Sequence, residues 1–531
     1  MLPFVWGLLL LLWVVVSILG SGIAVLHRCT PVRGMALVAY GAGAGVLLHA
    51  LLGLGIALAP ALRWSFVAAL ILFALAGTVY ILFRRVLKEL SIALSAPAKI
   101  SLLLWFVLLV IGLGILHLDV RFPESLPDGL YIAKAHTTSV RIQYLTGLPA
   151  DNYIPFAVSE FILRGVSFKN ERPILPANEV TNRTVLMSLV SVPFRVALGA
   201  PRDHPQLGTY TYIGRQWPDV WKLDAKYSFD EFAVVGLILN SFLLLGLLMF
   251  CSAIGGTSVL PLAALLYVTN AYFISQTIYT WPKPLAGFFI LLSWTSIRLR
   301  HSPAVVAILM ALAYHSHPYA IVFAAFVGLF YLVHSRGEKL RAHSALVYLC
   351  VFGLGIMPWI VWTRFILQIP SDLIAQNFAG PGTEAAWASP VNFLWIRLHN
   401  LFAMAAPTMF SVYPFDLGAV ANYWMFCLPG AVGIVIILPA LAQCARLEKP
   451  QPWLWYGLLG PACAILAVYS CPALPVLHGY QPLLGVLLFF GVWWLTEHTS
   501  RLVCIGFVGI QLVLNVCLVL ARGVVVGARF P

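Results

Sequence analysis

Apolar runs of roughly twenty residues recur along the chain, separated by short polar or basic turns. A helix needs roughly 20 apolar residues to cross a hydrocarbon core about 30 Å thick. The runs lack the alternation of polar and apolar residues that the strands of a membrane barrel require. The pattern therefore predicts an all-α polytopic membrane protein with about 14 transmembrane helices. The predicted spans cover residues 3–25, 35–59, 64–83, 100–118, 232–251, 258–275, 284–298, 302–316, 319–334, 344–363, 421–443, 453–470, 480–495 and 502–521.

A long polar insert, from Leu118 to Glu231, interrupts this pattern. It holds 12 of the 19 acidic residues and 12 of the 32 Lys and Arg residues. Most of the remaining chain consists of predicted lipid-soluble helices, in which polar chemistry is costly. We therefore expect the active or binding site to lie in this insert, on the side of the membrane to which the insert is exposed.

Two stretches of the insert, at 155–168 and 184–198, are too short or too interrupted to span a membrane. Their apolar faces are broken by Glu160, Arg164 and Arg195. This pattern is typical of amphipathic helices that lie on the membrane surface. The dense turn residues around them predict a compact irregular structure rather than a separate large domain.

A second extramembrane segment is predicted at 364–420. Within it, Ser389 and Pro390 suit the N-cap and the first position of a helix. The two extramembrane segments can cover one cavity. The predicted division is an N-terminal three-helix segment at 1–99, a catalytic core at 100–440 that includes both loops, and C-terminal helices at 441–531.

Composition and charge support the membrane class. Hydrophobic residues make up 61% of the chain and charged residues 10%, against about 25% charged residues in soluble domains. The net charge of +13 would fit a nucleic-acid partner, but the basic residues lie mostly in loops between spans and in the insert. Positive-inside topology and anionic head groups explain this charge better, so no nucleic-acid partner is expected. The nine Cys residues are scattered and form no disulfide framework or zinc pattern.

The basic loops orient the predicted helices. The loop at 84–99 carries four Lys and Arg residues and marks the cytoplasmic side. The next span then places the insert outside the cytoplasm. Later basic loops at 298–300, 336–341 and 446–449 also fall on the cytoplasmic side, and both termini fall outside.

Ionisable residues are absent from the middle of the predicted spans. Ion-coupled transporters usually carry buried ionisable groups near the midplane of the membrane. The sequence therefore favours an enzyme that works at the outer face over a transporter. The mid-span polar residues are His49, Asn240, Asn270, Gln511 and Asn515.

Asp119 is the first candidate for chemistry, because it directly follows the apolar run at 100–118. A carboxylate at a partly dehydrated surface can have its pKa raised, which suits it to take a proton from a hydroxyl group. The alternative is an ordinary helix-end carboxylate among lipid head groups. Further carboxylates are Glu124 and Asp128, which also suit plain turns, and the adjacent pair Asp230 and Glu231 at the far end of the insert.

Outer-side cations are candidates for binding a phosphate. Lys283 lies between two predicted spans where the positive-inside rule does not explain it, although a snorkelling lysine is the alternative. His315 and His317 lie at the tip of two short spans, and their spacing does not favour a paired metal site. We expect Lys283 and His317 to face one cavity and bind phosphate, while a structural histidine is the alternative. The remaining outer-side cations are Lys134, Arg364 and Arg397.

The arrangement resembles the C-type (GT-C) integral-membrane glycosyltransferases, relatives of the protein O-mannosyltransferases and the lipid A aminoarabinose transferases. The resemblance covers about residues 100–440. It rests on the acidic residue of LDVRF at Asp119, the long first outer loop, and the stretches YTWPKPLA, AYHSHPYA and MPWIVWTRF. The chain departs from the family in having three additional N-terminal helices and no adjacent Asp-Glu pair at Asp119.

The resemblance implies a sugar transfer with inversion, from a polyprenyl-phosphate-linked donor to a lipid or glycan acceptor, on the non-cytoplasmic side. The implied location is a bacterial cytoplasmic membrane, with the site facing the periplasm or exterior. No cofactor is indicated, although a divalent metal is compatible with the pattern. The alternatives are a polysaccharide polymerase or ligase that uses a lipid-diphosphate donor and outer arginines, and, from a different class, a lipid or glycolipid flippase.

Overall fold

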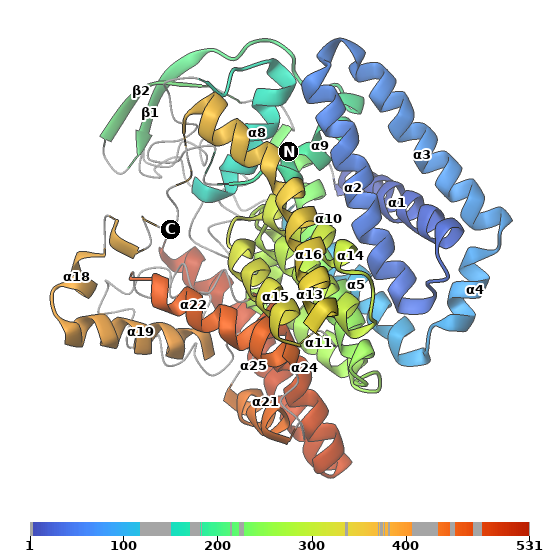
Figure 1. The fold of residues 1–531 in the computed structure, drawn as a ribbon, viewed down its shortest axis with the longest axis vertical. Coiled ribbons are helices and arrows are strands. Elements are labelled where there is room, and N and C mark those ends of the chain that lie inside the picture. Colours follow the sequence, from blue (N-terminus) through green and yellow to red (C-terminus); the bar gives the residue numbers. More distant parts are fainter. Residues whose placement is uncertain are drawn as a thin grey trace. The chain divides into compact units, whose positions relative to one another are not determined.

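Figure 1 shows the computed structural model of the chain, in which most of the described residues are helical. The chain forms two compact units, of which unit 1 is Met1–Leu245, Gln276–Leu285 and Gly523–Pro531, and unit 2 is Gly246–Ser275 and Ala286–Arg522. The predicted three-part division stays a prediction. The described residues are 4–116, 150–169, 181, 183–212, 215–221, 223, 228–334, 338–369, 371, 375, 378–380, 383–405, 434–446, 452–470 and 481–529.

The described residues confirm a mainly helical chain and include helices that are candidates for crossing a membrane. Six helices are long and apolar enough to cross a membrane, and shorter apolar helices of 10–17 residues follow several of them. The predicted count of about 14 spans is not confirmed. The six candidate spans are Phe4–Cys29, Gly34–Leu58, Pro60–Phe83, Ala96–Leu116, Ser228–Ala253 and Arg341–Leu367.

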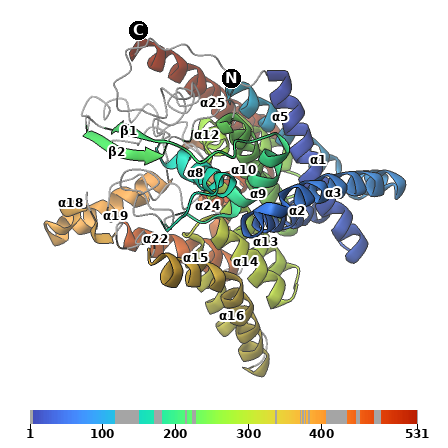
Figure 2. The same cartoon turned by 90° about the horizontal axis from the view of Figure 1, so that it is seen from above.

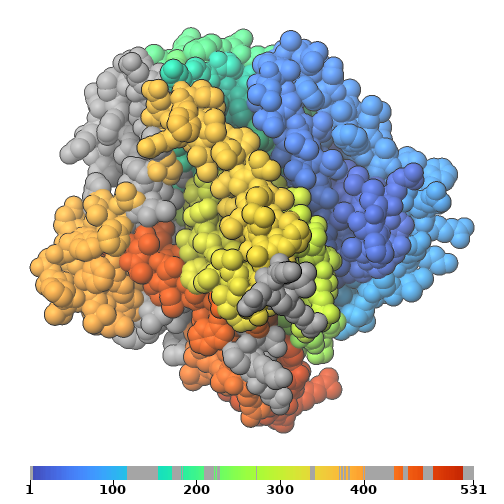
Figure 3. Space-filling view, viewed as in Figure 1, coloured from blue at the N-terminus to red at the C-terminus, as the bar shows by residue number. Residues whose placement is uncertain are grey.

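In unit 1, three N-terminal helices pack side by side and appear as neighbouring blue helices in Figures 1 and 2. Figure 3 shows them forming a continuous surface. Glycines permit their close approach: a Cβ built on Gly22 would lie 1.9 Å from the Gly41 oxygen, and one on Gly45 would lie 2.0 Å from the Ile18 oxygen. Small residues play this role between membrane helices. The three helices are α1 (Phe4–Cys29), α2 (Gly34–Leu58) and α3 (Arg63–Phe83), and a short turn η1 (Pro60–Leu62) joins the last two.

The basic end of these helices is held by a polar contact. His27 at the end of α1 hydrogen-bonds through Nδ1 to the Tyr80 hydroxyl at 3.1 Å. Its Nε2 lies 3.0 Å from Oε2 of Glu89 in α4 (Val86–Ala93). The contact joins the ends of α1 and α3 to the short helix that precedes α5 (Ala96–Leu116).

The insert is more ordered than the sequence indicates. It contains α8 (Ala150–Arg164), α9 (Leu186–Ala197) and a hairpin of β1 (Leu207–Tyr212) and β2 (Arg215–Trp221). The hairpin pairs antiparallel, with Tyr212 opposite Arg215. The sequence reading did not predict this hairpin, although aromatic and β-branched residues such as those in LGTYTY favour strands.

The prediction that α9 lies on the membrane surface needs a correction. Ten of its twelve residues are buried. It packs directly on α2, where a Cβ on Gly53 would lie 1.9 Å from the Leu189 oxygen. The Ser188 hydroxyl also donates to the Pro155 carbonyl of α8 at 2.7 Å. α8 and α9 therefore belong to the packed interior of unit 1.

Unit 2 is built from further helices. Four of the described helices are divided between the units: α10 (Ser228–Ala253) and α13 (Lys283–Arg298) contribute their first residues to unit 1, and α12 (Ala271–Ile278) and α25 (Arg501–Arg529) contribute their last residues to it. The other described elements are α11 (Leu260–Thr269), α14 (Pro303–Ser316), α15 (Ala320–His334), α16 (Glu338–Val361), η3 (Trp362–Leu367), α18 (Glu384–Trp387), α19 (Pro390–Ala405), α21 (Ile434–Arg446), η4 (Leu454–Leu459), α22 (Gly460–Val468) and α24 (Gln481–His498).

Asn270 divides the single span predicted at 258–275. Its side-chain oxygen accepts from the Tyr272 backbone N–H at 2.9 Å, as an N-cap residue does, so α12 starts anew after α11. Its amide donates to Asn515 at 3.3 Å, and Gln511 donates to the same Asn515 oxygen at 2.9 Å. Three of the five mid-span polar residues thus form one hydrogen-bonded group.

The predicted N-cap of α19 is confirmed. The Ser389 hydroxyl accepts from the Asn392 backbone N–H at 3.1 Å, and the helix begins at Pro390. Proline at this position needs no hydrogen bond of its own.

Candidate functional site

The first half of α10 is the element around which the polar parts of unit 1 gather. The Phe156 ring of α8 lies 5.2 Å from the Phe229 ring and 5.7 Å from the Phe232 ring of α10. A Cβ built on Gly236 would lie 2.8 Å from Cγ2 of Thr280 and 3.7 Å from Sδ of Met187 in α9. α8, α9 and the segment 276–285 therefore meet on the same half of α10.

The C-terminal half of α5 packs on the same helix. A Cβ built on Gly112 would lie 2.5 Å from Cδ1 of Leu237 and 3.5 Å from Cγ1 of Ile278. The Trp105 indole N–H donates to the Ser241 hydroxyl at 2.9 Å. α5 ends at Leu116, three positions before Asp119 in the sequence.

A buried charged group joins α8 to α9. Glu160 and Arg195 are fully buried and Arg164 is 9% exposed. Arg164 Nε donates to Glu160 Oε2 at 2.5 Å, and the Arg195 guanidinium donates to Glu160 Oε1. Arg195 also donates to the Ser159 hydroxyl at 2.8 Å, and its guanidinium lies 5.1 Å from the centre of the Phe156 ring. The carboxylate thus holds two arginines inside the insert.

Glu231, in the first turn of α10, lies beside this group. It is 9% exposed and interacts electrostatically with Arg195, Glu160 and Asp230. Of the carboxylates named from the sequence, Glu231 is buried at the junction of the insert and α10. It therefore remains a candidate for proton transfer, together with the half-buried Asp230.

Lys283 is buried, which argues against a snorkelling lysine at the lipid boundary. It is 7% exposed, and its Nζ lies 3.7 Å from the centre of the Trp281 ring. A cation over the face of tryptophan is held by the ring quadrupole. The segment that carries it is tied to α10, because the Asn240 amide donates to the Tyr279 carbonyl at 2.6 Å. Lys283 is thus a fixed charge at the first turn of α13.

His315 and His317 make different contacts, as their spacing indicates. The His315 Nε2 donates to the Gly355 carbonyl of α16 at 2.9 Å. His317 is 3% exposed, its Nδ1 accepts from the Tyr319 N–H at 3.2 Å, and its ring lies 5.1 Å from the Tyr319 ring. Lys283 belongs to unit 1 and His317 to unit 2. That these two share one cavity stays a prediction.

The outer arginines of unit 2 differ from each other. Arg364 is exposed in η3. Arg397 donates to the Ala467 carbonyl at 3.1 Å and to the Ser470 hydroxyl at 2.9 Å, and it stacks 3.4 Å from the Phe393 ring centre. Burial lowers the pKa of Arg397. These contacts give Arg397 a structural role between α19 and the end of α22.

Four residues named from the sequence lie outside the described ranges: Asp119, Glu124, Asp128 and Lys134. Their predicted roles stay predictions. The sequence pattern missed the pairing of Glu160 with Arg195, although the spacing of Glu160 and Arg164 by four residues was a signal for an ion pair on one helix face. In the described part of the chain, no group of three or more His, Cys, Asp or Glu residues is arranged to hold a metal ion.

Comparisons of this chain with protein-family models, with curated proteins and with solved structures found no match.

Proposed function

We propose that the protein is a membrane-embedded glycosyltransferase of the GT-C type, which moves a sugar from a polyprenyl-phosphate donor to an acceptor at the extracytoplasmic face. The observation that carries the proposal is Lys283, a buried lysine fixed over Trp281 on the half of α10 that also receives the charged insert helices. A buried cation close to the charged insert helices is suited to bind the phosphate that leaves from such a donor.

The reaction needs two groups of the protein, a base and a cation. A carboxylate takes the proton of the acceptor hydroxyl, and the oxygen then forms a bond to the anomeric carbon of the sugar. The bond from that carbon to the phosphate oxygen breaks, and polyprenyl phosphate leaves with its charge matched by Lys283. Asp119 is the proposed base, and Glu231 is the alternative, supported by its burial next to Arg195.

Purified protein in lipid nanodiscs provides the direct test. Radiolabelled polyprenyl-phosphate pentoses and hexoses are offered with a membrane extract as acceptor, and both sugar transfer and release of polyprenyl phosphate are measured. Asp119→Asn should lower turnover on the order of 10²- to 10⁴-fold while the protein still binds donor. Asp230→Asn and Glu231→Gln are compared in parallel, so that retained turnover in Asp119→Asn reveals whether one of them is the base.

The same assay separates the alternatives. A polymerase or ligase would use lipid-diphosphate sugars and release a lipid diphosphate, with outer arginines such as Arg364 in place of a carboxylate base. A flippase would move fluorescent glycolipid between leaflets without transferring sugar. Failure to transfer sugar from every monophosphate donor, together with activity in either alternative assay, would overturn the proposal.

A further inference from the structure

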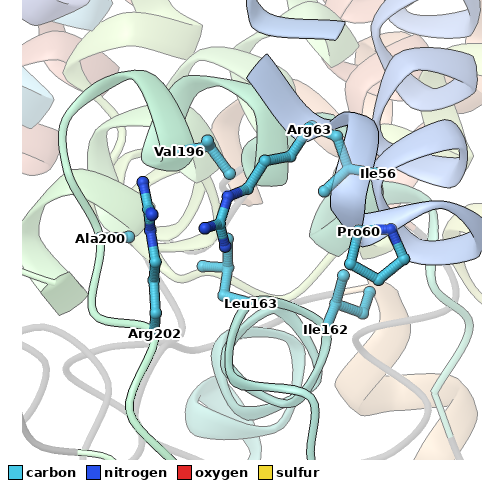
Figure 4. Close-up of a pocket in the computed structure, with 8 residues that line it drawn as sticks. All are labelled: Ile56, Pro60, Arg63, Ile162, Leu163, Val196, Ala200 and Arg202. Atoms are coloured by element: carbon cyan, nitrogen blue, oxygen red, sulfur yellow. The ribbon is translucent and has the colours of Figure 1, made fainter. Parts of the chain in front are cut away.

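A crevice in unit 1, distinct from the Lys283 region, carries two arginines on an apolar floor. It encloses about 310 Å³, including its open side. Figure 4 shows Arg63, the first residue of α3, and Arg202, in the segment after α9, extending into the same space. No acidic residue is among the eight described residues that line it. The other lining residues are Ile56, Pro60, Ile162, Leu163, Val196 and Ala200.

The floor of the crevice is part of a packed core. Ile56, Val67, Val192 and Val196 are buried together, with Ile162 and Leu163 packed against them. α2, α3, α8 and α9 all contribute to this cluster, so Arg63, at the start of α3, is attached to a rigid element. Arg202 is exposed in the segment after α9, while the packed helices preform the apolar floor of the crevice.

The two arginines lack anionic partners within the described part of the chain. Arg63 is half-buried, and neither arginine forms a hydrogen bond or ion pair with another described residue. Arg202 instead lies with its guanidinium 5.1 Å from the centre of the Trp64 ring. Two like charges in one partly apolar space repel each other unless an anion lies between them. This differs from Arg195 and Arg164, whose charges are matched by Glu160.

Phosphate chemistry fits this arrangement best. A guanidinium group presents a planar set of donors that matches phosphate oxygens, and two such groups can hold one phosphate from two sides. The predicted orientation also places Arg63 on the extracytoplasmic side, where the positive-inside rule does not account for it.

The surroundings identify the source of the phosphate as a lipid. α3 begins at Arg63 and exposes large apolar side chains along its length, and only five of its 21 residues are buried. Acyl chains can lie on such a surface while the head group enters the crevice. The exposed residues of α3 include Trp64, Ile71, Leu72, Phe73, Leu75, Val79, Leu82 and Phe83.

We infer that Arg63 and Arg202 form a binding site for the phosphate of a membrane lipid head group, at the outer end of α3. The site does not depend on the glycosyltransferase proposal. It gives the three N-terminal helices, which are additional to the family pattern, a role in holding a phosphate-bearing lipid against the insert.

Native mass spectrometry of the full-length protein in detergent tests this inference. The protein is titrated with phosphatidic acid and, separately, with diacylglycerol that has the same acyl chains but no phosphate. The wild type should retain phosphatidic acid at least tenfold more tightly than diacylglycerol. Arg63→Gln and Arg202→Gln should each weaken phosphatidic acid binding about tenfold, because each removes a charge-assisted contact. The matched control is Arg84→Gln, an exposed arginine at the opposite end of α3, which should bind like the wild type.

Two further measurements distinguish a lipid phosphate from inorganic phosphate and check that the variants remain folded. If inorganic phosphate competes as strongly as phosphatidic acid, the site holds phosphate but its lipid source is wrong. Arg63→Lys and Arg202→Lys keep the charge and should retain intermediate affinity at unchanged thermal stability. Equal binding of phosphatidic acid and diacylglycerol, or wild-type affinity in the Arg63→Gln, Arg202→Gln double variant, would overturn the inference.

Discussion

Two arginine-bearing regions of unit 1 lie on neighbouring faces of α8 and α9 and are built in opposite ways. Inside the insert, Glu160 binds Arg164 and Arg195, and the charged atoms are shielded from solvent. In the crevice, Arg63 and Arg202 share a space that no acidic residue lines among the described residues. The comparison teaches that a buried charge matched within the chain cannot lose its partner without destabilising the fold, whereas unmatched charges at an open crevice suit an anionic ligand.

The largest expected effect is in the matched group. Glu160→Gln leaves Arg164 and Arg195 buried without their carboxylate, which should lower the free energy of unfolding by about 3 to 5 kcal/mol. Thermal or denaturant unfolding in detergent measures this loss. The control is Glu384→Gln, at an exposed glutamate. If Glu160→Gln were as stable as this control, the matched group would not be structural and the comparison would fail.

A smaller effect, in ligand binding, is expected at Lys283. Lys283→Met should weaken the binding of a polyprenyl-phosphate sugar by about 10- to 100-fold, because it removes one charge-assisted contact with phosphate. Cross-linking with a photoactivatable polyprenyl phosphate measures the binding. Lys283→Arg keeps the charge and should retain part of the cross-linking. Undiminished cross-linking in Lys283→Met would transfer the role to another cation, with the exposed Arg364 tested first.

The crevice should behave in the opposite way to the matched group. Arg63→Gln should change the free energy of unfolding by no more than about 0.5 kcal/mol, because a substitution away from a buried network rarely does more. It could even stabilise the protein without lipid, since one of two like charges is removed. Unfolding in lipid-free detergent is the measurement. A loss near that of Glu160→Gln would mean that the crevice arginines are matched within the chain.

The smallest effect concerns the contact at the basic end of α1. The hydrogen bond to His27 holds the pKa of the Glu89 carboxyl below its ordinary value of 4.5, and the charges of His27 and Arg33 act in the same direction. A carboxyl group with a lowered pKa adds stability above the pKa of the unfolded chain, and this is lost as the pH falls through the folded pKa.

Glu89→Gln should therefore reduce the melting temperature slightly at pH 7, and its difference from the wild type should shrink below about pH 4.5. A series of melting curves across this range checks the sign. A difference that did not shrink below about pH 4.5 would show that Glu89 contributes nothing through its charge.

Local patterns in the sequence predicted much of the fold. The spans that became α1, α2, α3, α5 and α10 followed from apolar length alone, because the cost of exposing polar backbone in lipid leaves few alternatives to a helix. The start of α19 followed from Ser389 and Pro390, since capping depends on neighbouring residues. The sequence also showed directly that the middle of the predicted spans lacks ionisable residues.

Tertiary structure alone decided which residues meet. Glu160 and Arg195 are 35 positions apart, so their pairing depends on how α8 packs on α9, which no local period encodes. Asn270 divided a predicted span because its side chain both caps α12 and reaches Asn515, 245 positions later. The crevice of Arg63 and Arg202 likewise arises from four helices that share one apolar cluster. Apolar length determines that a segment becomes a helix, but specific long-range contacts determine which charges are matched and which are left for a ligand.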